Sequence, residues 1–481
     1  MNNNHNNVVV LELNEITWDL MDIFLKKGLL PNFQALKQTG TWGAPWASEL
    51  PEHLDPWVTW TTLYTGVPQE EHGLTMLEQD RETIHAKRLW EYLEDEGVRI
   101  GLFGSANAWP PHQLNGFWIP GPFSRDYATY PASLEPIQEL NIGLTRGHTA
   151  GLPKPSLKSL IPKLMRLGLS VSTLMRLGKA MVDMRRHPKT GWKKVALQPI
   201  VNMDLFASLY KQYQPQFATI HSNHVAYYQH RFWRAMAPER FEVPPSDEER
   251  SVYGGAIEHG YRVADEMLGR LRKLCGPDTT LVVLSSCGQQ PATGGRYAED
   301  QEHGNVGLQV RIKTLLEKMG IADKVEYSNL MAPQWKIDTA DPALFERTLA
   351  QLNAGKNLTR DIPCFAAHVE GESICFGARR EQQMDDTLEI MTASGPQKLR
   401  AGELLEKHSE VAKSGKHDPK GVLLMHGAAI RPNIHIEKCD NLDIAPTLMR
   451  LLGQPIPRSM KGRVLEEGLV GGEAPVAVGA R

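Results

Sequence analysis

The sequence has few of the features that mark a secreted, disulfide-bonded or membrane-spanning protein. It holds five cysteines in 481 residues, and no two of them are spaced Cys-x-x-Cys. An odd, scattered set of cysteines is typical of a reduced protein and argues against a zinc ribbon. No apolar run approaches the roughly 20 residues of a membrane-spanning helix. The short run from Val8 to Leu11 is followed by Glu12, so it predicts a strand and not a signal peptide. We therefore expect a cytoplasmic protein without a transmembrane segment.

The sequence also lacks an excess of charge of one sign, since its formal net charge is −3. It contains no zinc finger and no aromatic strand motif of an RNA-binding domain, so we expect no nucleic-acid partner. The Thr65-Gly66 loop is not followed by Gly-Lys-Ser/Thr, which excludes a P-loop.

One segment departs from this balance. Residues 151–200 carry eleven lysines and arginines against a single acid, Asp183, and their apolar residues recur at helical spacing. Two interpretations remain open. The segment is a helical cap with a solvated basic face, or it is a surface for an anionic partner such as substrate phosphates, a glycan phosphate or acidic lipid headgroups.

Buried-strand patterns alternate with helical patterns along most of the chain. Apolar runs at 8–11, 98–104, 217–220 and 280–284 predict strands separated by helices. We predict an α/β fold, with a mostly parallel sheet flanked by helices, a helical cap and a small α+β insertion. The predicted divisions are an N-terminal part of the core at 8–145, the basic cap at 146–205, the core continued at 206–310, the insertion at 311–400, the C-terminal part of the core at 401–467 and a flexible tail at 468–481.

Six segments, in order along the chain, carry a family resemblance. They are 8–15 with 30–33; 60–66 with 72–73; 108–111 with 115–117 and 129–131; 229–233; 284–288; and 414–421 with 442–447 and 460–463. Together they resemble the alkaline phosphatase superfamily, in its type I phosphodiesterase/nucleotide pyrophosphatase branch. The resemblance implies an alkaline phosphatase-like core. It also implies hydrolysis of phosphate esters by two divalent metals and a Thr or Ser nucleophile, with six or seven Asp and His ligands.

Several of these implied positions hold other residue types. The first aspartate ligand falls on Asn14, the nucleophile on Pro56 beside Asp55, the aspartate of an Asp-x-x-x-His pair on Ala226, and an Asp-His ligand pair on Ser286 and Cys287, while the histidines His230 and His417 are kept. Asparagine and serine are poor ligands for a dinuclear site. The resemblance therefore implies at most one divalent metal, zinc, manganese or magnesium. A slip of one residue would put Asp55 in place of Pro56, and the sequence leaves that choice open.

The candidate site residues lie where strands end, because α/β sheets bind ligands at the carboxyl ends of their strands. We predict catalytic roles for Asp55, Glu12, Asn14 and Cys287; substrate binding by Glu15, Asn107, Trp109, Gln289, Gln290 and Asn223; and metal binding by His230, His417, His224 and Asp418. The alternatives are structural. Asp55 before proline is a common turn start, Glu15 would be favourable in the first turn of a helix, and Cys287 would pack as a small apolar residue.

Three functions remain open at this stage. The first is a divergent hydrolase or transferase acting on an anionic small molecule or glycan, namely a phosphate ester, a phosphorylated glycan or a nucleotide. The second is a metal-independent glycosidase or esterase on the same fold, with Glu12 and Asp55 as paired carboxylates. The third is a non-catalytic ligand-binding protein that keeps the pocket.

Overall fold

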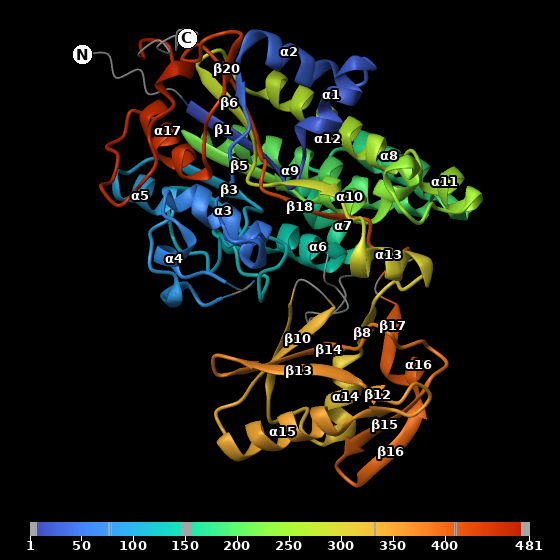
Figure 1. Cartoon of the computed structure of the whole chain (residues 1–481). Helices are drawn as coiled ribbons and strands as arrows, with labels where there is room; N and C mark the ends of the chain where they lie inside the picture. The colour runs from blue at the N-terminus through green and yellow to red at the C-terminus, as the bar shows by residue number, and fades with distance from the viewer. Residues whose placement is uncertain are drawn as a thin grey trace, which may run out of the picture.

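The centre of the protein is an eight-stranded, mostly parallel sheet (Figure 1). The computed structural model describes residues 7–472 except 76, 78, 146–155, 331–332, 408 and 410. Only β19 runs antiparallel to its neighbours in this sheet. In spatial order the strands are β20 (Ile434–Ile436), β2 (Thr41–Gly43), β19 (Val422–His426), β6 (Thr279–Ser285), β1 (Asn7–Leu13), β5 (Phe217–Ser222), β3 (Ile100–Phe103) and β4 (Gly116–Ile119). This confirms the predicted fold class.

Strand β1 lies in the middle of the sheet and is buried on both faces. Its side chains alternate between two separate apolar cores: Val9 and Leu11 belong to one core, and Val8 and Val10 belong to the other. Burial on both faces is the reason that the strand reads as a continuous apolar run. The same alternation carries Glu12 to the face of Val8 and Val10.

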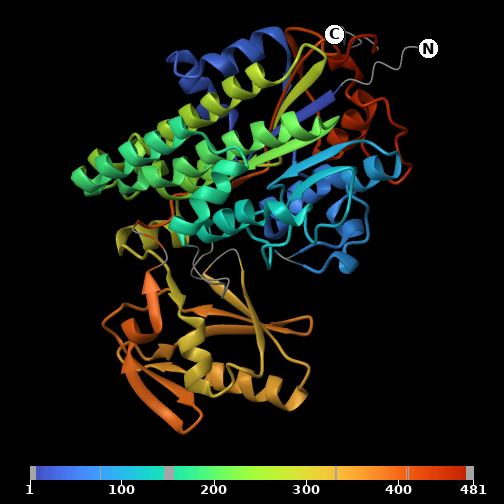
Figure 2. The same cartoon turned by 180° about the vertical axis from the view of Figure 1, so that it is seen from behind.

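Helices cover both faces of the sheet (Figures 1 and 2). The core that contains Val9 includes residues of α1 (Trp18–Lys26), α2 (Pro31–Thr39), α6 (Glu135–Thr145), α9 (Leu197–Tyr213), α10 (His224–Met236) and α12 (Ala256–Leu274). The core that contains Val8 includes residues of α3 (Pro56–Thr65), α5 (Leu89–Asp95) and α17 (Ile444–Leu451).

The basic segment forms helices that extend the first of these two layers. They are α7 (Leu157–Arg166), α8 (Val171–Arg186) and the 3-10 helix η4 (Pro188–Ala196), which leads into α9. Leu160 and Leu164 of α7 join the Val9 core, so the segment packs on the α/β body by its apolar side. Residues 146–155 of the predicted cap lie outside the described residues.

A smaller lobe is inserted in the sequence between α13 (Gly295–Glu302) and β18 (Gly415–Asp418) of the α/β body (Figure 1). It begins at β8 (Leu308–Val310) and ends at β17 (Leu405–Lys407), and these two strands pair antiparallel at its entrance. The lobe has an apolar core of its own. It contains the strands β9 (Glu326–Asn329), β10 (Gln334–Asp338), β13 (Phe365–Glu370), β14 (Ser373–Ala378), β15 (Thr387–Thr392) and β16 (Gly395–Arg400), with the helices α14 (Ile312–Met319), α15 (Pro342–Ala354) and α16 (Ala401–Leu404). Of the predicted flexible tail, residues 473–481 lie outside the described residues.

Candidate active site

The polar residues of the site gather where β1, β3, β5 and β6 end. Asn14 and Glu15 follow β1, and Asn223 follows β5. Helix α3 begins at the same edge with Pro56, which places Asp55 there as its N-cap residue. The short strand β7 (Gly288–Pro291) pairs antiparallel with β18, so that Gln289 lies opposite His417. Parallel strands that end together therefore bring residues from distant parts of the sequence to one place.

The centre of the site is the buried carboxylate of Glu15, which lies between two histidines. Its Oε2 atom is 2.9 Å from Nε2 of His230 and 3.7 Å from Nε2 of His417. The two imidazole ring centroids are 5.3 Å apart. This confirms the predicted meeting of His230 and His417. Glu15, predicted to bind substrate, lies with both histidines in a three-residue group able to hold a metal ion.

Both histidines are oriented through their other ring nitrogen. The Nδ1 atom of His230 lies 3.2 Å from the carbonyl oxygen of Gly415, and Nδ1 of His417 lies 3.3 Å from Oδ1 of Asp55. A carbonyl oxygen can only accept a hydrogen bond, so Nδ1 of His230 carries the proton. A carboxylate or carbonyl at Nδ1 is the usual second partner of a metal-binding histidine. Both Nε2 atoms are thereby directed at Glu15.

The electrostatics of the three groups are coupled. Burial alone would raise the pKa of Glu15, but the charges of His230 and His417 and the hydrogen bonds from His230 and Gln289 lower it to about 2. Burial lowers the pKa of His230, against the opposing effect of Glu15. Burial also acts to lower the pKa of His417, but Glu15 and Asp55 outweigh it and the pKa is raised. Glu15 is therefore an anion at neutral pH that two imidazoles or a cation must balance.

The carboxylate is held rigidly in place. Gln289 donates a hydrogen bond from its amide to Oε2 of Glu15, and Asn14 donates to Oε1 at 3.0 Å. Glu15 itself has a left-handed backbone conformation with a φ of 61°. Such a conformation costs a residue with a side chain of order 1–2 kcal/mol. Gln289 was predicted to bind substrate; in the structure it positions Glu15.

The donor set of this group fits a divalent metal ion. Two imidazoles and a carboxylate are a common set for a hydrolytic zinc site. Two further positions at which the resemblance implies metal ligands, Asn14 and Ser286, hold neutral side chains that bond to their neighbours. Trp60 donates to Oδ1 of Asn14 at 2.9 Å, and the hydroxyls of Thr59 and Ser286 are 2.7 Å apart. These contacts use the polar atoms that would otherwise be available to a second cation.

Two predicted metal ligands lie outside this group. His224 is buried with both ring nitrogens engaged, at 2.7 Å from the hydroxyl of Ser222 and 3.0 Å from the carbonyl of Gly260. Asp418 accepts a hydrogen bond from the backbone of Lys420, two residues later. The short sequence distance from His224 to His230 suggested a shared site, but on helix α10 the two residues face different surroundings.

Two predicted catalytic residues are enclosed. Cys287 is fully buried, and burial raises the pKa of its thiol well above the ordinary value, so it is no nucleophile in this conformation. Glu12 is fully buried as well. It accepts hydrogen bonds from Tyr64 at 2.5 Å and Ser105 at 2.8 Å, and lies 2.9 Å from Nδ1 of His221. Both residues support the site from within the core, which differs from their predicted roles.

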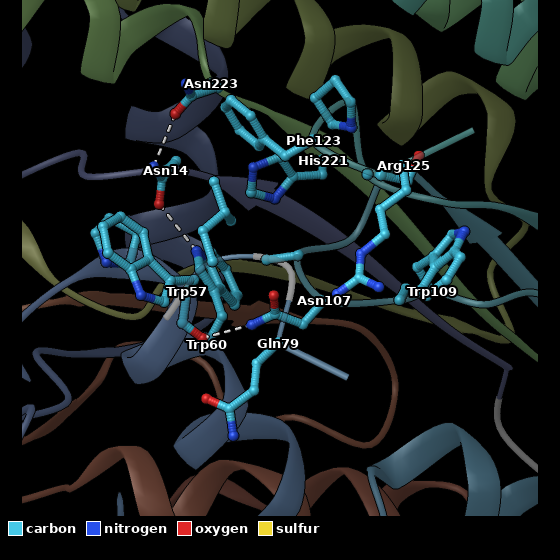
Figure 3. Close-up of a pocket in the computed structure, with 18 of the residues that line it drawn as sticks. Asn14, Trp57, Trp60, Gln79, Asn107, Trp109, Phe123, Arg125, His221 and Asn223 are labelled. Carbon is cyan, nitrogen blue, oxygen red and sulfur yellow. Dashed lines mark hydrogen bonds between the residues drawn. The ribbon is translucent and has the colours of Figure 1, made fainter. Parts of the chain in front are cut away.

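A pocket rich in aromatic side chains borders the Glu15 group (Figure 3). Asn14, Pro56 and Asn223 belong to its wall, and Asn14 donates to Asn223 at 2.7 Å. The predicted residues Asn107 and Trp109 line it too. The amide of Asn107 donates to the carbonyl of Trp57 at 2.7 Å, which fixes one side of the pocket. The predicted Gln290 is elsewhere and donates to the backbone of His417 at 3.4 Å.

Sequence reasoning missed several residues of this pocket. They are Trp57, Trp60, Gln79, Phe123, Arg125 and His221. One of them could have been found: His221 is a polar residue at the end of a predicted strand, in register with Glu12 of β1. The others lie in helix α3 and in loops, where no periodic pattern indicates which side chains line a cavity.

Comparisons with known proteins identify the family of the chain. A sequence profile described as type I phosphodiesterase / nucleotide pyrophosphatase matches residues 8–306. The chain belongs to this phosphodiesterase family. Membership supports phosphate-ester hydrolysis as the general class of its chemistry. No curated protein sequence matches the chain. Among solved structures, murine ectonucleotide pyrophosphatase/phosphodiesterase 5 is similar at 13% sequence identity with a TM-score of 0.42, over 96% of this chain and 100% of that one.

Within the described residues, no helix is long and apolar enough to cross a membrane.

Proposed function

We propose that the protein hydrolyses a phosphate ester at one divalent cation held by Glu15, His230 and His417. The observation that carries the proposal is the pair of Nε2 atoms directed at a single buried carboxylate oxygen, at 2.9 and 3.7 Å. When bound, a divalent cation would neutralise phosphate charge and lower the pKa of a coordinated water. Fixed Nδ1 partners on both rings support a metal-binding role, because they leave Nε2 as the ring atom that can coordinate a cation.

The protein's own residues would do the remaining work. Asp55 and the Gly415 carbonyl hold the two imidazoles, while Gln289 and Asn14 hold the carboxylate. Asn14 also lies in the pocket wall, so one side chain contacts both Glu15 and the substrate cavity. His221 lines the same cavity, and its Nδ1 is engaged by Glu12. Its Nε2 is then the ring atom left for a hydrogen bond with substrate.

The pocket supports a substrate with a planar or ring-shaped organic group. Trp57 and Trp109 offer partly exposed aromatic faces, on which a nucleobase or a sugar ring can stack. Arg125 lies over the Trp109 ring at 5.2 Å and adds positive charge to the same wall, although Asp80 pairs with it at 2.7 Å. A nucleotide or a phosphorylated glycan satisfies both features.

The metal-independent alternative has less support. It requires Glu12 and Asp55 to act as paired carboxylates, and Glu12 is enclosed by three polar side chains with no exposed surface. Asp55 is engaged with His417. A carboxylate that reacts with substrate must be reachable by it, and only Asp55 meets this condition.

The test measures hydrolysis of a chromogenic phosphodiester such as bis(p-nitrophenyl) phosphate. We expect turnover to stop on metal removal and to return with zinc, manganese or magnesium. Glu15→Gln and His230→Ala should each lower turnover by at least about a hundredfold. His303→Ala, an exposed histidine in a loop, is the matched control. Full activity after metal removal and in Glu15→Gln would overturn the proposal, and metal binding without turnover of any phosphate ester would favour the non-catalytic function.

A further inference from the structure

Helix α8 presents an apolar stripe to solvent although the helix is otherwise well anchored. Val171, Met175 and Val182 are 59%, 66% and 49% exposed. Their spacing of four and seven residues puts them on one face of the helix. Single exposed apolar residues need no explanation, but three in line on one helix indicate a contact surface.

The opposite face of α8 is fixed to the α/β body. Thr173 is buried there, and Leu174 and Leu177 pack against the main core. Ser170 caps the helix by accepting a hydrogen bond from the backbone of Thr173, and its own hydroxyl donates to Asp204 at 2.7 Å. Arg176 forms an ion pair with Glu266. The helix is therefore rigidly mounted, with the stripe directed away from the body.

Basic residues border the stripe. Lys179, Arg185 and Arg186 are exposed and lie on the same half of the helix as Val182. Across the described part of the chain, no ion pair is seen for any of these three. Residues 156–200 hold ten lysines and arginines against Asp183 as the one acid, in a protein with a net charge of −3. Figure 1 shows α8 at the edge of the α/β body opposite α17, and Figure 2 shows the same helices from behind.

We propose that α8 docks the protein on the surface of a membrane rich in anionic lipid, with Val171, Met175 and Val182 inserted among the headgroups and the flanking lysine and arginines paired with lipid phosphates. Helices of this kind, apolar on one stripe and basic beside it, lie in the membrane interface. The combination selects a lipid over the other anionic partners. A nucleic acid or a soluble phosphate would use the basic groups but leave the apolar stripe in water. A second copy of the chain would oppose two basic segments of like charge.

Vesicle cosedimentation of the full chain tests this docking surface. We expect binding to vesicles of phosphatidylcholine with phosphatidylglycerol, little binding to pure phosphatidylcholine, and weaker binding at higher salt. Arg185→Gln with Arg186→Gln should lower the affinity by at least about tenfold, because each basic residue near an anionic surface contributes on the order of 1 kcal/mol. Met175→Ser with Val182→Ser should also lower it, by at least about fivefold.

The matched control replaces exposed apolar residues elsewhere. Leu358→Ser with Val369→Ser changes side chains of the small lobe that are 40% and 49% exposed, and should leave binding unchanged. If only the arginine variant loses affinity, the surface binds anions by charge alone and the lipid proposal is wrong. Equal binding to charged and uncharged vesicles, or none to either, overturns it as well. Because the readout is binding and not turnover, the result does not depend on the proposed hydrolysis.

Discussion

The carboxylate of Asp55 lies 3.3 Å from Nδ1 of His417, on the ring nitrogen opposite to the one that approaches Glu15. This contact gives Asp55 an orienting role toward a candidate metal ligand. It also bears on the choice between Asp55 and Pro56. Pro56 is buried as the first residue of α3 and has no reactive group, whereas the side chain of Asp55 is 33% exposed at the site.

The Asp55 contact predicts a change in metal affinity. Asp55→Asn keeps the shape of the side chain but removes the charge that orients and polarises His417. We expect metal affinity to fall by about 10- to 100-fold, as for other partners of metal-binding histidines. Competition with a metal-chelating dye measures this. Asp418→Asn is the control and should have little effect, because Asp418 follows His417 in the chain but bonds to the backbone of Lys420 and not to the metal group. An unchanged affinity in Asp55→Asn would show that the contact is incidental.

The burial of Cys287 predicts that its thiol is dispensable. Because the side chain is enclosed and its pKa is raised, Cys287→Ala should retain turnover and lose only some stability from the small cavity. Alkylation of the folded protein by iodoacetamide, read by peptide mass spectrometry, should label the partly exposed Cys275 before Cys287. Loss of turnover in a folded Cys287→Ala protein would contradict this prediction and would support Cys287 as a nucleophile.

The aromatic wall predicts an effect on substrate binding. Trp109→Ala removes a stacking face and should raise KM for a nucleotide or glycan ester by about tenfold, with a smaller effect on kcat. Trp109→Phe keeps a ring and should recover most of the loss. Trp46→Ala, at an exposed tryptophan away from the pocket, serves as the control. If a substrate with only small alkyl groups shows the same change in KM, stacking is not the cause.

The enclosure of His224 predicts a pH dependence of stability. Burial lowers the pKa of this histidine from 6.5 to about 4. The unfolded chain therefore takes up a proton before the folded one, and the free energy of unfolding should fall by about 3 kcal/mol as the pH drops from 6.5 to 4. His72, whose pKa burial also lowers to about 4, acts in the same direction.

Denaturant unfolding across this pH range tests the prediction. His224→Gln preserves a donor toward the Gly260 carbonyl but cannot titrate, so its unfolding free energy should depend less steeply on pH. His303→Gln should leave the slope unchanged. If His224→Gln does not alter the pH dependence of the unfolding free energy, the folded protein accommodates the protonated imidazole of His224 and the prediction is wrong.

Local sequence patterns determined the architecture of this protein. The runs at 8–11, 217–220 and 280–284 became β1, β5 and β6 because strands buried on both faces must be apolar throughout. Parallel strands end at a shared edge, and for that reason His230 and His417, far apart in the sequence, could be expected to meet.

Only the tertiary structure decided what those histidines contact. Glu15 turns between them because the backbone after β1 enters a left-handed conformation and because Gln289 and Asn14 hold its carboxylate. His224 and Cys287, equally plausible by position, are closed off by their neighbours. Loop conformation and side-chain direction depend on packing between segments that are distant in the sequence. The periodicity of strands and helices, by contrast, can be recognised from consecutive residues. The sequence could therefore locate the site and its two histidines, but it could not show that Glu15 lies between them or that His224 and Cys287 lie apart.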